Sequence, residues 1–176
     1  MLFTVVISIV ILQRLIELLI AKRNEKRLLS QGAYEAGAAH YPVMVAMHIA
    51  FFVSLITEVM LFSRPLSALW DVFLIIFLIA QIMRIWCLIS LGKFWNTKII
   101  ILPGADIVRK GPYKWVRHPN YLIVTTELLI LPLMFSSYFT VIIFTLLNGW
   151  MLAVRIPAEE KALKEATNYR EKFSMK

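Results

Sequence analysis

The chain has 176 residues, of which 60% are hydrophobic and only 17% are charged, and its formal net charge at pH 7 is +8. Soluble domains carry about 25% charged residues, so this composition excludes an ordinary soluble globular domain, and the single cysteine excludes an internal disulfide and a cysteine-based metal cluster. The basic residues lie next to apolar stretches rather than in a polar domain of their own, so we expect membrane lipids as partners, and neither nucleic acid nor metal.

Five apolar stretches follow one another, each close to the roughly 20 residues that a transmembrane helix needs. They cover residues 2–20, 42–62, 69–91, 121–135 and 138–154. The first is expected to remain as an uncleaved helix, because it contains Arg14 and Glu17 and no small-residue cleavage site follows it. The fourth is short and contains Pro132, so it is expected to be tilted, bent or part of a hairpin with the fifth. The sequence therefore predicts an all-α integral membrane protein with about five transmembrane helices.

Lysines and arginines are distributed unevenly over the connections between these stretches. Most of them lie in the first connection, in the long third connection and in the C-terminal tail, whereas the second connection contains only Arg64. Basic residues concentrate in cytoplasmic loops. The sequence therefore predicts a multi-pass protein of the plasma membrane, with the N-terminus outside and the C-terminus and polar chemistry in the cytoplasm.

No linker, internal repeat or low-complexity tract interrupts the chain, so residues 1–176 are predicted to form a single membrane domain. In this description residues 1–91 contain three N-terminal spans. Residues 92–176 contain a polar loop, a helical hairpin and a C-terminal amphipathic helix lying along the membrane surface. That last helix is expected to begin at Pro157, with Glu159 and Glu160 in its first turn.

The polar chemistry is concentrated in residues 111–122, GPYKWVRHPNYL. The residue before a proline avoids the helical region, so we expect His118 to be extended and Pro119 to begin the fourth span. The first backbone N–H groups of that helix then lack intrahelical partners and suit an anion such as a carboxylate. The alternative is an ordinary interfacial anchor, which also contains such a turn with Tyr, Trp, Arg and Lys.

Three segments in a fixed order point to a family. They are DIVRKGPYKWVRHPNY at 106–121, RIPAEEKAL at 155–163 and NYREKF at 168–173, with one helical hairpin between the first two. This pattern resembles the isoprenylcysteine carboxyl methyltransferase family, and the resemblance covers residues 92–173. It implies a membrane enzyme that transfers a methyl group from S-adenosylmethionine to a lipophilic acceptor entering from the bilayer.

The resemblance also implies roles for individual residues. The residues implied to contact S-adenosylmethionine are Ala105, Asp106, Ile107, Val108, Tyr113, His118, Pro119, Asn120, Tyr121 and Glu159. Arg155 is implied to face the acceptor, and Arg155 and Glu159 are expected to be the catalytic residues. At Ala105 the eukaryotic enzymes have a histidine, and a contact through the backbone would survive that difference.

The chemistry of these side chains suits the cofactor and an anionic acceptor. The start of the fourth span with His118 can hold a carboxylate, and Glu159 can accept from an ammonium or hydroxyl group. Glu160 is instead expected to pair with Lys164 on the surface. The guanidinium of Arg155 can orient a carboxylate or an enolate. Such an acceptor is ionised near neutral pH, so positioning and exclusion of water are expected to dominate the reaction.

Several alternatives stay open at this point. The acceptor is either a prenylcysteine-like carboxylate or an enol or phenol hydroxyl of an alkyl polyketide. Two other function classes are a membrane reductase, with Arg109 and Lys110 near an NADPH phosphate, and a non-catalytic scaffold. Arg84 and Glu127 are expected to form a pair that either supports the pocket or joins helices. His48 has no assigned role.

Overall fold

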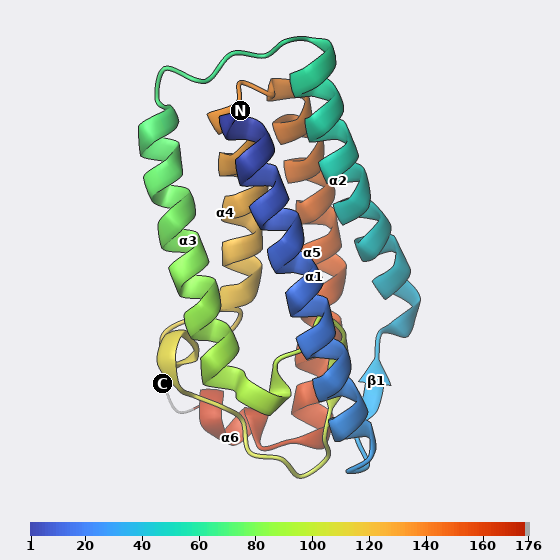
Figure 1. Ribbon diagram of the computed structural model, residues 1–176. Coiled ribbons are helices and arrows are strands. Elements are labelled where there is room, and N and C mark those ends of the chain that lie inside the picture. Colours follow the sequence, from blue (N-terminus) through green and yellow to red (C-terminus); the bar gives the residue numbers. More distant parts are fainter. Residues whose placement is uncertain (175–176) are drawn as a thin grey trace. The chain divides into compact units, whose positions relative to one another are not determined.

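The computed structural model describes residues 1–174 (Figure 1). Its helices and strands are α1 Leu2–Leu29, β1 Tyr34–Ala36, α2 Tyr41–Leu61, α3 Trp70–Leu91, β2 Ile99–Ile101, α4 Pro119–Met134, α5 Tyr138–Ala166 and α6 Tyr169–Ser174. Single 3₁₀ turns lie at Ala38–His40, Gly92–Phe94 and Gly111–Lys114. The predicted all-α membrane fold is confirmed, with one short pair of strands added to it.

The long apolar helices correspond to the predicted spans. Within residues 1–174, four helices are long and apolar enough to cross a membrane, namely α1, α2, α3 and α5. The apolar helix α4 is shorter, with 16 residues, and ends two residues after Pro132. These helices make the chain an integral membrane protein.

The connection between α4 and α5 is a tight turn of the kind that joins a helical hairpin. Ser136 has a φ of +53°. Its N–H donates to the Leu133 carbonyl oxygen at 3.2 Å, and the Ser137 N–H donates to that of Pro132 at 2.9 Å. This is the Schellman pattern, in which a left-handed residue ends a helix and satisfies its last carbonyls. The predicted hairpin is therefore present.

The described residues group into two compact units. Unit 1 comprises Met1–Ala38, Leu91–Val108 and the described part of Pro157–Lys176. Unit 2 comprises Ala39–Ser90 and Arg109–Ile156. Helix α5 contributes residues to both. The prediction of a single membrane domain divided at residue 91 stays a prediction.

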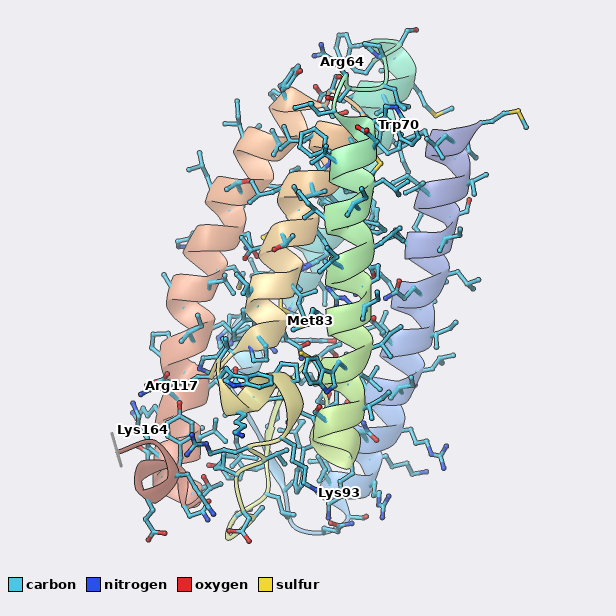
Figure 2. All side chains as sticks on the ribbon, turned by 90° about the vertical axis from the view of Figure 1, so that its left-hand side faces the viewer. Arg64, Trp70, Met83, Lys93, Arg117 and Lys164 are labelled. Carbon is cyan, nitrogen blue, oxygen red and sulfur yellow. The ribbon has the colours of Figure 1, made fainter. Side chains whose placement is uncertain are left out.

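In unit 2, α2, α3, α4 and the first part of α5 pack together, with polar side chains buried and apolar ones exposed. Along α3 the exposed residues include Ile75, Ile79 and Ile82, while Arg84 is buried. This arrangement suits lipid, which accepts apolar side chains and excludes charged ones. Figure 2 shows Arg64 and Trp70 at one end of these helices and Arg117 at the other. The second connection and the part of the third connection that belongs to unit 2 therefore lie at opposite ends of that unit.

Unit 1 is built around the pair of strands. β1 and β2 are antiparallel, with Glu35 opposite Ile100. Ile99 and Ile101 of β2 form a buried cluster with Ala162 of α5. The partly buried residues packed against this cluster are Ala36, Ala158, Leu163 and Ala166. Alanines at intervals of four present small side chains on one face of α5, so the helix can lie close to the strand.

A charged cluster joins three segments of unit 1. Lys98 Nζ donates to Glu25 at 2.9 Å and to Glu35 at 3.0 Å. The hydrogen bond to Glu25, and to a smaller extent the one to Glu35, raises the pKa of Lys98 above its usual value. The ammonium group therefore stays charged throughout the physiological pH range. Asn24 of α1 adds two hydrogen bonds to the same loop, to the carbonyl oxygens of Gly92 and Trp95.

The predicted start of the C-terminal helix at Pro157 is wrong. Helix α5 continues through Pro157 to Ala166, and α6 is a separate helix of 6 residues. Proline lacks an N–H and so leaves the carbonyl of Ala153 without its helical donor. Packing of Ala158 and Ala162 against β2 stabilises the turns that follow, and this explains why the helix does not end at Pro157.

Candidate active site

A glycine allows the loop after α3 to approach that helix closely. In unit 2, Gly111 has a φ of +52°, and a Cβ atom placed on it would lie 2.2 Å from the hydroxyl oxygen of Ser90 and 2.8 Å from the indole nitrogen of Trp86. Any side chain would force these groups apart, and the backbone conformation itself favours glycine. The motif therefore needs Gly111 for geometric reasons.

The turn that follows this glycine buries the first predicted cofactor residue of unit 2. Residues Gly111–Lys114 form a 3₁₀ turn in which Pro112 and Tyr113 are buried. The ring of Trp115 meets that of Trp86 edge to face, with centroids 5.8 Å apart. This ring contact joins the turn that contains Tyr113 to the end of α3.

Helix α4 begins where the sequence predicts. His118 has φ −127° and ψ 62°, outside the helical region, and the helix starts at Pro119. Proline suits this position because its fixed φ is close to the helical value and it needs no backbone partner there. The rings of His118 and Tyr121 stack with centroids 5.4 Å apart. The predicted extended His118 and the start at Pro119 are confirmed.

Asn120 places an unsatisfied acceptor at the same helix start. Its Oδ1 atom is buried and has no hydrogen-bond partner in the described part of the chain. An unpaired buried polar atom is unfavourable, so this oxygen suits a donor from a bound ligand. Together with the N–H groups that begin α4, this oxygen gives the helix start both hydrogen-bond donors and an acceptor for a ligand.

Arg155 ends a row of buried residues on α5. These residues recur at intervals of three and four: Val141, Phe144, Asn148, Met151 and Arg155. This spacing keeps them on one helix face, and Arg155 is only 5% exposed. Its Nε–H donates to the Tyr121 hydroxyl at 2.9 Å, and its guanidinium carbon lies 6.0 Å from the centroid of that ring. The structure thus brings His118, Tyr121 and Arg155 together.

A second polar contact joins α4 and α5 one turn further along. Asn148 Nδ2 donates to Thr125 Oγ1 at 2.9 Å, and the Thr125 hydroxyl donates to the Tyr121 carbonyl oxygen at 2.8 Å. Thr125 follows Tyr121 by one helical turn, and Asn148 precedes Arg155 by two. Both contacts therefore use the same faces of the two helices. They fix the register of α4 against α5 and, with it, the position of Arg155.

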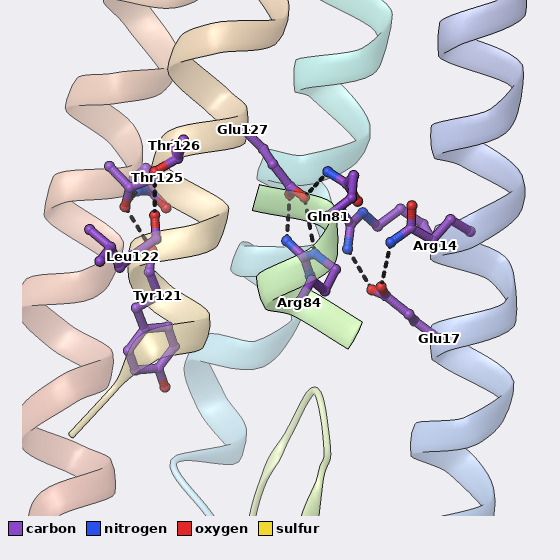
Figure 3. A network of polar contacts seen from close by, with 11 residues as sticks. Arg14, Glu17, Gln81, Arg84, Tyr121, Leu122, Thr125, Thr126 and Glu127 are labelled. Atoms are coloured by element: carbon purple, nitrogen blue, oxygen red, sulfur yellow. Dashed lines mark hydrogen bonds and ion pairs between the residues drawn. The ribbon is translucent and has the colours of Figure 1, made fainter. Parts of the chain in front are cut away.

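Two polar side chains of α3 converge on a carboxylate of α4 (Figure 3). Arg84 Nε donates to Glu127 at 3.0 Å, a second guanidinium nitrogen completes an ion pair, and Gln81 donates at 2.7 Å. Arg84 and Glu127 are 4% and 8% exposed, so the predicted pair is confirmed and joins α3 to α4. Its contribution to a pocket stays a prediction. His48 contacts its own helix, where Nδ1 donates to the Met44 carbonyl oxygen at 2.8 Å.

In unit 1, the predicted cofactor segment follows a β-turn after β2. The Ala105 N–H donates to the Leu102 carbonyl oxygen at 3.2 Å. Proline occupies the second position, and Gly104 occupies the third with a φ of +73°, as a type II turn requires. The Gly104 N–H also donates to the Ala166 carbonyl oxygen at 2.9 Å. The loop is therefore attached to the end of α5.

Asn168, which sequence reasoning did not select, contacts the same loop. Its Oδ1 accepts from the Ile107 N–H at 3.0 Å, and its Nδ2 donates to the Asp106 carboxylate. The motif segment NYREKF begins at this asparagine, but the resemblance assigned it no role. Glu159 lies on α5 in unit 1 and is partly buried. The neighbouring Glu160 accepts from Lys164 at 2.9 Å, so that predicted ion pair is confirmed.

The predicted site residues are thus divided between the units. Those in unit 1 are Ala105, Asp106, Ile107, Val108 and Glu159. Those in unit 2 are Tyr113, His118, Pro119, Asn120, Tyr121 and Arg155. Their roles toward a cofactor and an acceptor stay predictions.

Comparison with known proteins gives a family and two bacterial relatives. The sequence model of the isoprenylcysteine carboxyl methyltransferase (ICMT) family matches residues 73–165. The uncharacterised protein YpbQ of Bacillus subtilis (strain 168) is 47% identical over 163 residues, which are 93% of this chain and 97% of that protein. An uncharacterised protein of Haemophilus influenzae (strain ATCC 51907 / DSM 11121 / KW20 / Rd) is 32% identical over 151 residues, or 85% of this chain and 88% of the relative.

Proposed function

The chain belongs to the isoprenylcysteine carboxyl methyltransferase family and is therefore a membrane methyltransferase, and from this premise we propose its donor and acceptor. The donor is S-adenosylmethionine. The acceptor is lipophilic, enters from the bilayer, and offers either a carboxylate or an enol or phenol hydroxyl. The transfer takes place on the cytoplasmic side of the plasma membrane.

The observation that carries this proposal is the environment of Arg155. A guanidinium that is 5% exposed lies at the end of the apolar part of α5, and the Tyr121 hydroxyl accepts from its Nε–H. The terminal nitrogens of such a guanidinium can donate two parallel hydrogen bonds to a carboxylate or enolate. This chemistry supports an acceptor that is negatively charged when it reacts.

The other residues support binding and orientation. S-adenosylmethionine supplies an electrophilic methyl group. The N–H groups that begin α4, with His118, suit its carboxylate, while the Asn120 Oδ1 atom and the Glu159 carboxylate suit its donors. The acceptor oxygen is the nucleophile. A carboxylate or an enolate is already ionised near neutral pH and needs no general base, whereas a phenol would first release its proton to water, which the positive charge of Arg155 would favour. The rate enhancement then comes from alignment by Arg155 and from exclusion of water.

Calorimetry with purified protein tests the donor. We expect S-adenosylmethionine to bind and NADPH to give no heat. His118→Ala and Glu159→Gln should each lower the affinity for S-adenosylmethionine by at least about tenfold, the value of one hydrogen bond to a charged group. The variant Lys161→Gln, an exposed position two residues from Glu159, should bind as the wild type does. Binding of NADPH instead would favour a reductase, and binding of neither would favour a scaffold.

Labelling of a membrane lipid extract tests the acceptor. Protein incubated with methyl-labelled S-adenosylmethionine should transfer label to a lipid-soluble product. Mild alkali releases labelled methanol from a methyl ester but leaves a phenol methyl ether intact, so hydrolysis and mass spectrometry distinguish the two acceptor groups. Absence of any labelled lipid product, with cofactor binding intact, would contradict a lipophilic acceptor.

A further inference from the structure

In unit 1, the turn between α5 and α6 forms hydrogen bonds with the loop that contains the predicted cofactor segment. We propose that Asn168 is a positioning residue that holds Asp106 and Ile107 in the conformation that binds S-adenosylmethionine. This inference rests on the proposed function, because it takes the segment from Ala105 to Val108 as part of the cofactor site. It assigns to Asn168 a role that acts through the loop rather than on the cofactor directly.

The carboxamide of Asn168 uses both of its ends. Its Oδ1 accepts from the backbone N–H of Ile107 at 3.0 Å, and its Nδ2 donates to Oδ1 of Asp106. The two contacts fix two consecutive residues of the loop, one through its backbone and one through its side chain. Asn168 is partly buried whereas Asp106 is exposed, so the carboxamide is the better shielded of the two groups.

An amide meets both requirements at once, because its oxygen accepts and its nitrogen donates. A carboxylate can accept from Ile107 but would present a second anion to Asp106, and an apolar side chain can do neither. One end of the amide contacts a charged group, and such hydrogen bonds are stronger than those between neutral groups. The identity of Asn168, and not only its size, is therefore what holds the loop.

A backbone contact places the two segments independently of this side chain. The Gly104 N–H donates to the carbonyl oxygen of Ala166 at 2.9 Å, two residues before Asn168. The type II turn at Gly104 directs the following residues, Asp106 and Ile107, toward the α5–α6 turn. This backbone hydrogen bond does not involve the side chain of residue 168. A substitution of Asn168 should therefore alter the conformation of the loop while the loop stays bound to the end of α5.

Two substitutions at position 168 provide the test. Asn168→Asp places two carboxylates side by side, and we expect the dissociation constant for S-adenosylmethionine to rise by at least about tenfold. Asn168→Gln keeps the carboxamide, on a side chain that is longer by one methylene group. It can still accept from Ile107 and donate to Asp106, so its affinity should lie within about threefold of the wild type.

The kinetic readout separates positioning from general destabilisation. Asn168→Asp should raise KM for S-adenosylmethionine with little effect on the melting temperature or on KM for the acceptor. Thr167→Val is the matched control, because the Thr167 hydroxyl donates at 2.6 Å to the Leu163 carbonyl oxygen of its own helix and should leave the affinity unchanged.

Three outcomes divide the possibilities. If the wild type does not bind S-adenosylmethionine, the proposed function fails. If the wild type binds and Asn168→Asp binds equally well, this inference fails while the proposed function stands. If Asn168→Asp and Asn168→Gln bind equally weakly, the two hydrogen bonds of the carboxamide do not account for the effect and the positioning role of Asn168 is overturned.

Discussion

Tyr121 has two separate functions in the structure, one for its ring and one for its hydroxyl. The ring stacks on His118 with centroids 5.4 Å apart, and the hydroxyl accepts from Arg155 at 2.9 Å. The resemblance to the family assigned Tyr121 to the cofactor, but nothing in the sequence indicated a contact with Arg155, 34 residues away along the chain. Contacts between such distant residues depend on helix register, and short sequence motifs do not encode register.

Tyr121→Phe removes the hydroxyl and leaves the ring. We expect KM for the acceptor to rise about tenfold, which is the loss of one hydrogen bond to a charged group, because the guanidinium of Arg155 is no longer oriented. The affinity for S-adenosylmethionine should change less than threefold, since the stacking on His118 persists. Steady-state kinetics with each substrate varied in turn, together with calorimetry of cofactor binding, measure both effects.

Tyr138→Phe is the matched control. Tyr138 is 53% exposed at the beginning of α5, and loss of its hydroxyl should alter neither parameter. If Tyr121→Phe weakens cofactor binding as strongly as acceptor binding, its hydroxyl belongs to the cofactor site and does not position Arg155.

The helices of unit 2 are joined by polar contacts that the spans alone did not predict. Glu58 of α2 accepts from the N–H groups of Phe139 and Thr140 at 3.2 and 2.8 Å, and Arg64 donates to it at 3.1 Å. A carboxylate at the N-terminus of α5 satisfies donors that have no partner within the helix and complements the helix dipole. Glu58 therefore caps a neighbouring helix.

Glu58→Gln should destabilise the protein by about 1–3 kcal/mol. Both carboxylate oxygens accept hydrogen bonds in the wild type, and in the variant an NH₂ group would replace one of them and face the same donors. Thermal unfolding in detergent, followed by circular dichroism, should show a lower midpoint. Asp71→Asn, at an exposed carboxylate in the first turn of α3, should have a smaller effect of a few tenths of a kcal/mol. Equal midpoints for Glu58→Gln and the wild type would contradict the capping role.

The sequence predicted the long helices better than it predicted where the helices end and which residues they contact. The apolar runs located the long helices, and Pro119 located the start of α4, because both signals are local. The strands Tyr34–Ala36 and Ile99–Ile101 have three residues each, too few to show an alternating pattern. Pro157 was misread because proline usually ends a helix, and the packing on β2 that keeps α5 intact is a tertiary effect.

For the whole molecule, the charge distribution is the strongest guide to orientation. The second connection contains Arg64, at the end of unit 2 opposite Arg117 (Figure 2). The basic residues of the motif loop in unit 2 are Arg109, Lys110, Lys114 and Arg117. The more basic side faces the cytoplasm in most membrane proteins, so the motif loop is expected there. The sequence contains no comparable signal for the division into units 1 and 2, because each unit combines segments that are far apart in the chain.

Cysteine labelling in intact cells tests this orientation. In a background of Cys87→Ala, which removes a buried thiol, Ala68→Cys and Lys114→Cys each introduce a single thiol at an exposed position. Ala68 lies in the chain between Arg64 and Trp70, at one end of unit 2, and Lys114 lies three residues before Arg117, which is at the other end (Figure 2). A membrane-impermeant maleimide should label Ala68→Cys in intact cells and Lys114→Cys only after permeabilisation. The reverse pattern would place the motif loop outside and remove a cytoplasmic source of cofactor.

The unbroken stretch of α5 between its capped beginning and Arg155 also limits how the protein can sit in lipid. From residue 140 to residue 155 a helix rises about 22 Å, which is less than the hydrocarbon thickness of about 30 Å, and any tilt shortens it further. The main chain at these two residues therefore cannot lie at both headgroup layers of a bilayer of ordinary thickness. Either the lipids around this helix are compressed, or the side chains at one end extend from the level of the acyl chains toward the headgroups.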